Sequence, residues 1–384
     1  MKKDNTNKVF LGIFLLGLAS LFNDIGSEML TPIMPLFLKA LGGGGIVIGL
    51  VGGLRDGISS IIKVFSGYVS DRVGKRKVFV NLGYVISFVF RFLLAFTKTA
   101  NQALFFSSFE RIGKLRDAPR DVMISIYTKK RKGKGFGLHQ ALDTTGGILG
   151  GIILLVLFWK FNLSFRFIIV IASIFSFLSL LPLIFVKEIK TRAVKRKLIK
   201  NIDKIPQKLL FLFLIIGIFS LANFSYMFFI LKASDFFNEK HASIPIMLFV
   251  LFNIFYASFA YPFGVLADKF GKKKIILIGY ILFSLVSFGF IFSNSLIIFI
   301  FLFIFYGLSY SLIEGNQRAL VAELSPKEIK GSSIGLFHTI KGFLALPASL
   351  IAGFLWNFTH NGVFFYGFIT SLIAVLLMFG FKEK

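Results

Sequence analysis

The sequence predicts an all-α integral membrane protein with twelve transmembrane helices, arranged as two six-helix bundles with pseudo-two-fold symmetry. Its composition is 56% hydrophobic, with 52 Phe and a mean hydropathy of +0.80. A water-soluble domain cannot bury that much apolar surface, so the chain needs lipid as its solvent. The apolar residues fall in runs of about twenty, which is enough for a helix to cross a bilayer. A basic loop that recurs half a chain length later indicates that the architecture is duplicated.

The apolar runs place six expected helices on each side of a polar linker. Residues 1–186 form the predicted N-terminal bundle, 187–208 a basic linker, and 209–384 the C-terminal bundle. The expected spans of the N-terminal bundle are 9–38, 46–69, 78–97, 102–127, 135–159 and 165–186. Those of the C-terminal bundle are 209–232, 243–267, 275–293, 296–320, 331–356 and 363–381. The first and fourth spans run long, so we expect them to tilt or to project into water.

The distribution of Lys and Arg predicts how the chain is oriented. Basic residues cluster in 72–77, 129–134 and 187–208, and these segments share one side of the membrane when the spans alternate. Cytoplasmic loops carry such an excess, so we expect a multi-pass protein of the cell membrane with both termini in the cytoplasm. The net charge of +26 lies in short loops between apolar runs. This placement argues against a nucleic-acid partner.

The repeat consists of a short loop and of matching positions beyond it. Residues 67–77 and 264–274 each carry a Gly, an Asp four residues later, a Gly three residues after that, and then a run of basic residues. One arginine and both tryptophans of the chain recur at nearly the same offset, Arg120 as Arg318 and Trp159 as Trp356. Each Trp falls at the end of an expected span, where the membrane interface favours this side chain. The sequence therefore predicts a six-plus-six duplication.

Several classes of protein are excluded by residues that the sequence lacks. The chain has no Cys, which excludes disulfides, thiol catalysis and thiolate metal sites. It also has no Gly-x4-Gly-Lys-Ser/Thr stretch, which argues against an ATP-driven pump. We therefore expect no enzyme, no cofactor and no metal. The expected partners are a small-molecule substrate, a proton or sodium ion and the lipid bilayer, with the chain acting as a monomer.

The loop at 67–77 resembles the signature loop of the major facilitator superfamily, Gly-x3-Asp-Arg-x-Gly-Arg/Lys-Arg/Lys, which joins the second and third helices. The copy at 264–274 lies between the eighth and ninth helices, where that family has a degenerate copy. The segment 110–121 also looks like the fourth helix of a prokaryotic branch of this superfamily. The resemblance covers the whole chain. It implies rocker-switch alternating access around a central cavity lined by helices 1, 4, 7 and 10.

The resemblance also implies that the two loops act as gates. Cations just past the end of a helix are favoured by its exposed carbonyl groups. Gly67 would let a helix of the other half come close, and Asp71 would hold a latch that opens in the other conformation. The expected gating residues are Gly67, Asp71, Arg72, Gly74 and Lys75 in the first loop, and Gly264, Asp268 and Gly271 in the second. The expected latch partners are Arg120, Asp121 and Asp143. A plain topogenic loop is the alternative.

Ionisable residues inside the expected spans are costly and concentrate in the N-terminal half. Asp24 and Glu28 are one helical turn apart on one face, and Arg116 lies at the same expected depth as Asp24. Burial favours a neutral carboxyl group and a nearby Arg favours the ionised one, so a carboxylate held between them can take up and release a proton. The predicted proton-coupling residues are Asp24, Glu28, Glu110 and Arg116. Sodium could use the same oxygens.

Other polar residues in the spans are candidates for the substrate cavity. They are Asn23, Arg111, Lys114, Asn223, Tyr226, Glu314, Asn316, Arg318 and Lys341. For Arg91, Lys63 and Asp56 we favour salt bridges that fix helix packing. The sequence thus predicts a secondary active transporter that moves a small solute and is proton-coupled, with export of a small organic or amphipathic compound favoured. The alternatives are proton- or sodium-coupled uptake of an anionic solute (an organic acid, phosphate ester or metal chelate) and a non-transporting receptor of the same fold.

Overall fold

The computed structural model describes residues 2–128, 132–188, 205–237, 243–326 and 329–382, with side chains described from residue 11 and, in the second range, from residue 135. All regular secondary structure in these ranges is helical. The predicted all-α class is confirmed. The predicted linker 187–208 and the basic segment 129–134 lie largely outside the described residues.

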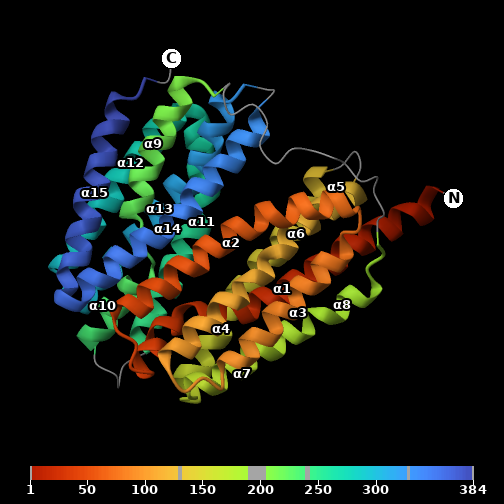
Figure 1. Cartoon of the computed structure of the whole chain (residues 1–384), viewed down its shortest axis with the longest axis horizontal. Helices are drawn as coiled ribbons and strands as arrows, with labels where there is room; N and C mark the ends of the chain where they lie inside the picture. Colours follow the sequence, from red (N-terminus) through yellow and green to blue (C-terminus); the bar gives the residue numbers. More distant parts are fainter. Residues whose placement is uncertain (1, 129–131, 189–204, 238–242, 327–328, 383–384) are drawn as a thin grey trace. The chain divides into compact units, whose positions relative to one another are not determined.

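The helices of the first half follow the six expected spans (Figure 1). The first three spans are α1 (Lys2–Ala40), α2 (Gly45–Val73) and α3 (Lys77–Leu94). The fourth consists of α4 (Ala100–Ile112), the 3₁₀ segment η1 (Gly113–Arg116) and α5 (Asp117–Thr128). The fifth is α6 (Lys132–Leu155) with the π-helical turn η2 (Val156–Lys160), and the sixth is α7 (Phe165–Leu178) with α8 (Leu180–Phe185).

The helices of the second half follow the other six spans. The seventh is divided into α9 (Gln207–Ala222) and α10 (Met227–Phe237). The others are α11 (Ser243–Phe270), α12 (Lys272–Ile291), α13 (Leu296–Leu324), α14 (Lys330–Phe358) and α15 (His360–Gly380). Among the described residues, eleven helical stretches are long and apolar enough to cross a membrane. The fourth expected span is not one of them, because seven charged side chains lie between Glu110 and Asp121.

The chain packs as two compact units. The first contains residues 1–37 and 61–198, and the second contains 38–60 and 199–384. The grouping places the first half of α2 with the second unit, whereas the sequence division assigns all of α2 to the N-terminal bundle. The division into bundles 1–186 and 209–384 therefore stays a proposal.

Glycine accounts for the packing of the first half of α2 inside the second unit. A Cβ atom added at Gly45, Gly49 or Gly53 would overlap the backbone of α14. These glycines recur every fourth residue and so share one face of α2. Two of the opposing positions on α14 are also small, namely Gly353 opposite Gly45 and Ser349 opposite Gly49. Small residues at this spacing let two helices approach backbone to backbone.

The two basic loops turn at the same glycine of the repeat. Gly74 has a φ of 71° and Gly271 has a φ of 98°. This left-handed region is open to glycine and strained for other residues. In the first loop, the carboxylate of Glu188 accepts the N–H groups of Arg76 at 3.0 Å and Lys77 at 3.1 Å, which caps the start of α3. The backbone conformation of the turn therefore explains why glycine occurs at this position in both loops. Its role in gating is a separate prediction.

Candidate functional site

The fourth span is interrupted in its middle by η1, which packs closely on α3. A side chain at Gly113 of η1 or at Gly83 of α3 would meet the backbone of the other helix. This approach positions Arg116, whose Nη1 donates to Ser87 Oγ and to the Gly113 carbonyl, both at 2.8 Å. The Arg116 guanidinium group also lies 4.6 Å from the centre of the Tyr84 ring. Arg116 is therefore held rigidly in the interior of the first unit.

Asp117, the first residue of α5, is shared by several cations. Its carboxylate lies 3.1 Å from Lys63 Nζ, 3.7 Å from Arg120 Nη1, 3.9 Å from Arg116 Nε and 4.0 Å from Lys114 Nζ. Four cations around one carboxylate leave an excess of positive charge here. Asp117 was not among the predicted site residues. The available signal was its position three residues after Lys114 and three before Arg120, which places all three on one helical face.

Asp24 of α1 meets Asp143 of α6, and their carboxyl groups interact directly. Asn23 Nδ2 donates to Asp24 Oδ1 at 3.2 Å. Lys114 and Arg116 are the cations whose charges act on Asp24. The structure thus brings Asp24 and Arg116, two predicted coupling residues, together with Asp143, a predicted latch partner.

Glycine also explains why α6 comes so close to α1. Gly146 lies against the backbone of Leu21, and Gly150 lies one turn further along against the backbone of Ile25. Glu28, the second predicted coupling carboxylate of α1, lies on the same interface, with its side chain beside Gly147 of α6. The two helices therefore carry acidic side chains into one narrow contact.

Ser20 connects this acidic contact with the charged face of α5. Its hydroxyl group accepts from Arg120 Nη1 at 2.7 Å and lies 3.1 Å from both the Tyr84 hydroxyl and His139 Nε2. Ser20, Tyr84 and His139 are all buried. Because Ser20 is one turn before Asp24 and His139 is one turn before Asp143, polar groups follow one another without interruption along α1 and α6.

Glu110, another predicted coupling residue, is enclosed in an ion pair. Its Oε1 lies 2.7 Å from Arg91 Nη2, and its Oε2 lies 3.3 Å from Arg111 Nε. Arg91 also donates to Ser176 Oγ and, at 3.3 Å, to the Asn23 carbonyl. Arg91 has no exposed surface. These contacts tie α3 to α1, α4 and α7, as expected for a packing salt bridge, and coupling through Glu110 stays a prediction.

The first gating loop is closed on itself by Asp71, whose Oδ1 lies 2.9 Å from Arg76 Nη2. Within the first unit, as far as it is described, Asp71 contacts neither Arg120 nor Asp121. Those two predicted latch partners instead pair with each other at 3.5 Å. Gly67 packs on Ala118 of α5, a helix of its own unit. The gating and latch roles stay predictions.

The second gating loop is closed in a similar way and has one more partner. Asp268 Oδ1 lies 3.0 Å from Lys272 Nζ, and Glu323 Oε2 at the end of α13 lies 2.9 Å from the same nitrogen. Both copies of the loop therefore form an Asp–cation bridge across the turn. In the second copy the bridge also joins α12 to α13.

The seventh span is broken at residues 223–226, where the sequence predicted one continuous helix. No Gly or Pro lies in this segment. Its backbone is stabilised by neighbouring side chains, because Ser349 Oγ accepts the Ser225 N–H at 3.2 Å and the Tyr366 hydroxyl donates to the Leu221 carbonyl at 2.9 Å. Non-helical backbone at membrane depth is tolerated only where it is buried in protein or lines a cavity. The Asn223 side chain accepts from the Tyr310 hydroxyl at 2.7 Å.

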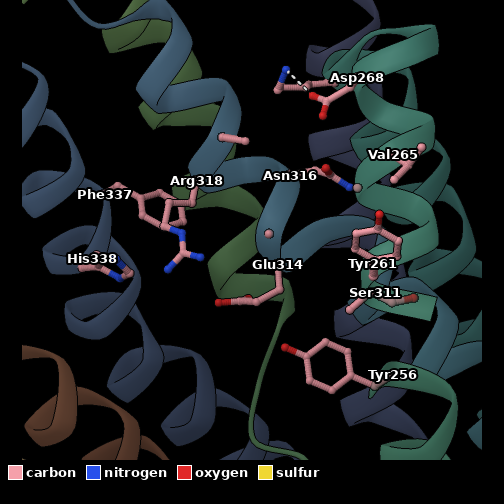
Figure 2. Close-up of a pocket in the computed structure, with 15 residues that line it drawn as sticks. Tyr256, Tyr261, Val265, Asp268, Ser311, Glu314, Asn316, Arg318, Phe337 and His338 are labelled. Carbon is pink, nitrogen blue, oxygen red and sulfur yellow. Dashed lines mark ion pairs between the residues drawn. The ribbon is translucent and has the colours of Figure 1, made fainter. Parts of the chain in front are cut away.

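A cavity of about 660 Å³ lies between α11, α13 and α14 in the second unit (Figure 2). Predicted substrate residues Glu314, Asn316 and Arg318 line it, and Lys341 pairs with Glu314 at 2.6 Å. The other lining side chains that matter below are Tyr256, Tyr261, Ser311, Phe337 and His338. Tyr226 lies outside this lining, with its ring 5.0 Å from that of Phe249.

The fold and the broken spans, with polar groups held at membrane depth, define a helical membrane transporter. Comparison with known proteins names its family. The sequence profile of the Major Facilitator Superfamily matches residues 16–237 and 212–384. An uncharacterized MFS-type transporter of Methanocaldococcus jannaschii is 46% identical over 386 residues, covering 98% of this chain and 97% of its relative. The chain belongs to the Major Facilitator Superfamily, a class of transporters and not of enzymes.

More distant similarities support the fold. The quinolone resistance protein NorA of Staphylococcus aureus is 32% identical over 119 residues, which is 30% of either chain. A crystal structure of a variant of the nucleoside transporter NupG matches with a TM-score of 0.80 and 15% identity, covering 97% of this chain and 99% of that one. A bacterial homolog of the human lysosomal transporter Spinster, in an inward-facing and unoccupied conformation, matches with a TM-score of 0.73 and 12% identity, covering 97% of this chain and 95% of that one.

Proposed function

We propose that the chain is a proton-coupled secondary active transporter that exports a small organic or amphipathic compound by rocker-switch alternating access. The contact between Asp24 and Asp143 carries the proposal. Two carboxylates at close range in a low-dielectric site repel each other when both are ionised, so the pair favours holding one proton between them. A site of this kind inside a membrane span is suited to a proton relay.

Lys114 supplies a means of releasing that proton. Its charge acts on Asp24, while its ammonium nitrogen lies 4.0 Å from Asp117. The side chain is half-buried and flexible, unlike Arg116, which is fixed by its two hydrogen bonds. Movement of Lys114 toward Asp24 would favour the ionised pair and expel the proton. Movement back toward Asp117 would favour proton uptake.

The direction of transport has two candidates. Export is supported by the partial match to a quinolone resistance protein. Proton- or sodium-coupled uptake of an anionic solute, such as an organic acid, phosphate ester or metal chelate, is the second candidate, and the exposed Arg318 in the cavity favours it. Under either direction we propose a monomer in the cell membrane with both termini in the cytoplasm.

Proton flux in everted membrane vesicles tests the proposal. Respiration acidifies the vesicle interior, and acridine orange reports the pH gradient while norfloxacin, ethidium, uridine or salicylate is added outside. Exchange of solute for protons restores fluorescence, whereas co-transport of solute with protons deepens the quenching. We expect a response in the wild type that is lost in both Asp24→Asn and Asp143→Asn.

A matched control is Asp235→Asn. Asp235 is also half-buried in an ion pair, with Lys39 and His360 each at 2.9 Å, but it lies far along the chain from the proposed coupling pair. Its variant should keep the wild-type response. A gradient that no probe disturbs in the wild type, or an unchanged response in Asp24→Asn, contradicts the proposal.

A further inference from the structure

We infer that the cavity of the second unit binds a planar aromatic carboxylate, an inference that rests on the proposed transport of a small organic solute. The cavity volume of about 660 Å³ falls within the range of small-molecule sites. All of its lining residues belong to α11, α13 and α14 or to Lys272 at the start of α12. The site is therefore complete within one unit.

The charges around the cavity point to an anionic ligand. Glu314 is paired with Lys341 at 2.6 Å, and Asp268 is paired with Lys272 at 3.0 Å. Arg318 is exposed and forms no hydrogen bond or close ion pair with any residue that the structure describes, although its charge acts on Glu314. Lys341 is thus engaged by Glu314, and its charge also acts on Asp56 of α2. Arg318, by contrast, has no close ion-pair partner among the described residues. An unpaired guanidinium group such as this one can donate two parallel hydrogen bonds to the carboxylate of a ligand.

The other end of the cavity, around Lys272, has more negative than positive charge. Asp268 and Glu323 share the single cation Lys272 there, and both carboxylate side chains are largely exposed, at 75% and 56%. Water screens exposed charges far more than partly buried ones. Both carboxylates of the end around Lys272 are therefore screened more than Glu314, whose side chain is 42% exposed. Arg318, unpaired among the described residues, gives the end around Glu314 its preference for an anion.

The walls of the cavity point to a planar ring. The Tyr261 side chain is 82% exposed and lines the cavity, so a face of its ring is available to stack on an aromatic ligand. Figure 2 shows the Arg318 guanidinium group and the Glu314 carboxylate directed into the same open space, with the Tyr256 hydroxyl turned toward it. Aromatic walls with a few convergent polar groups are typical of sites for small organic ligands.

Two glycines keep the space open. A Cβ atom added at Gly264 or at Gly315 would meet no heavy atom within 4 Å. Both residues line the cavity. A larger side chain at Gly315 would therefore project into the cavity without displacing the fold, and this makes Gly315→Leu a blocking variant.

Equilibrium binding to the purified protein, without any gradient, tests the inference. The probes are indole-3-acetate, its neutral isostere indole-3-acetamide, the cation tryptamine and the non-aromatic cyclohexaneacetate. We expect indole-3-acetate to bind at least roughly tenfold more tightly than the amide and tryptamine, because a lost charged hydrogen bond costs about 1.5–3 kcal/mol. It should also bind more tightly than cyclohexaneacetate, because a saturated ring cannot stack on an aromatic side chain. Arg318→Gln should remove the preference for acid over amide, and Gly315→Leu should abolish binding of every probe.

Arg166→Gln is the control, since Arg166 lies in the first unit and donates to the Thr97 carbonyl at 3.0 Å. This variant should bind like the wild type, and a melting curve of each variant shows that it is folded. Equal binding of acid and amide, tighter binding of tryptamine, no binding of indole-3-acetate at millimolar concentration, or an unchanged preference in Arg318→Gln overturns the inference. If indole-3-acetate does not bind but another probe still drives proton flux in vesicles, the inference about the ligand fails while the proposal of proton coupling stands. The two failures are therefore distinguishable.

Discussion

The two units carry different chemistry around their interrupted spans. The first unit gathers buried charges around the interrupted fourth span, where Asp117 is shared by four cations. The second unit gathers aromatic rings around the interrupted seventh span, where Phe219 stacks on Tyr280 at 4.0 Å and Phe229 on Tyr306 at 4.3 Å. A duplicated scaffold can therefore keep its helices while one half specialises in charge and the other in ring stacking.

Three positions make the comparison specific. The offset that relates Arg120 to Arg318 also relates Arg116 to Glu314, Asp143 to Lys341, and Asp117 to Gly315. The positive and negative positions of the first half, Arg116 and Asp143, are thus reversed in sign in the second half. There the two residues form the Glu314–Lys341 ion pair. Where the first half has the shared carboxylate, the second has a glycine at the edge of an open cavity. The same position in the repeat carries a charged side chain in one unit and no side chain in the other.

The largest effect should come from the buried pair of the first unit. Arg91→Leu or Glu110→Leu alone should lower stability by about 3–5 kcal/mol, because each leaves an uncompensated charge in the interior. The double variant should recover most of that loss, since two apolar side chains replace both charges. Thermal unfolding in detergent measures each step. A double variant as unstable as the singles would show that the pair does more than balance charge, for example through the hydrogen bonds from Arg91 to Ser176 and to the Asn23 carbonyl.

A smaller effect should separate the two corresponding positions directly. Asp117→Ala should destabilise the protein by about 1–3 kcal/mol, because its cations lose a common partner in a partly buried site. Gly315→Ala should instead stabilise the protein by up to about 1 kcal/mol, because its Cβ atom would enter open space and Ala favours a helix more than Gly does. The unfolding midpoints of the two variants provide the measurement. Equal shifts would mean that the units use this position alike.

The smallest effect should come from the ion pair of the second unit. The Glu314 and Lys341 side chains are 42% and 21% exposed, so solvent screens their attraction. Glu314→Gln should therefore change stability by less than about 1 kcal/mol. Its consequence should appear in ligand binding, because it removes the negative charge beside Arg318. A loss of stability as large as that of Arg91→Leu would place this pair among the packing salt bridges.

The sequence predicted the helices well because their signals are local. Apolar runs separated by basic loops placed all twelve spans, and the repeated Gly-Asp-Gly pattern located both turns. The pattern also predicted that ionisable residues gather in the first half. It missed Asp117 as the shared carboxylate, although its spacing from Lys114 and Arg120 was visible. Glu188 gave no such signal, because it caps α3 from a distant part of the chain.

The sequence by itself determined the membrane environment, the helix count, the duplication and the family, since each follows from composition or from spacing along the chain. Only the tertiary structure decided which buried charges meet. Asp24 was expected beside Glu28 and Arg116, but its direct carboxyl partner is Asp143, because glycines on α6 fix the register of that helix against α1. The break at 223–226 likewise depends on hydroxyl groups from α14 and α15. Contacts between helices depend on packing that no single stretch of sequence encodes.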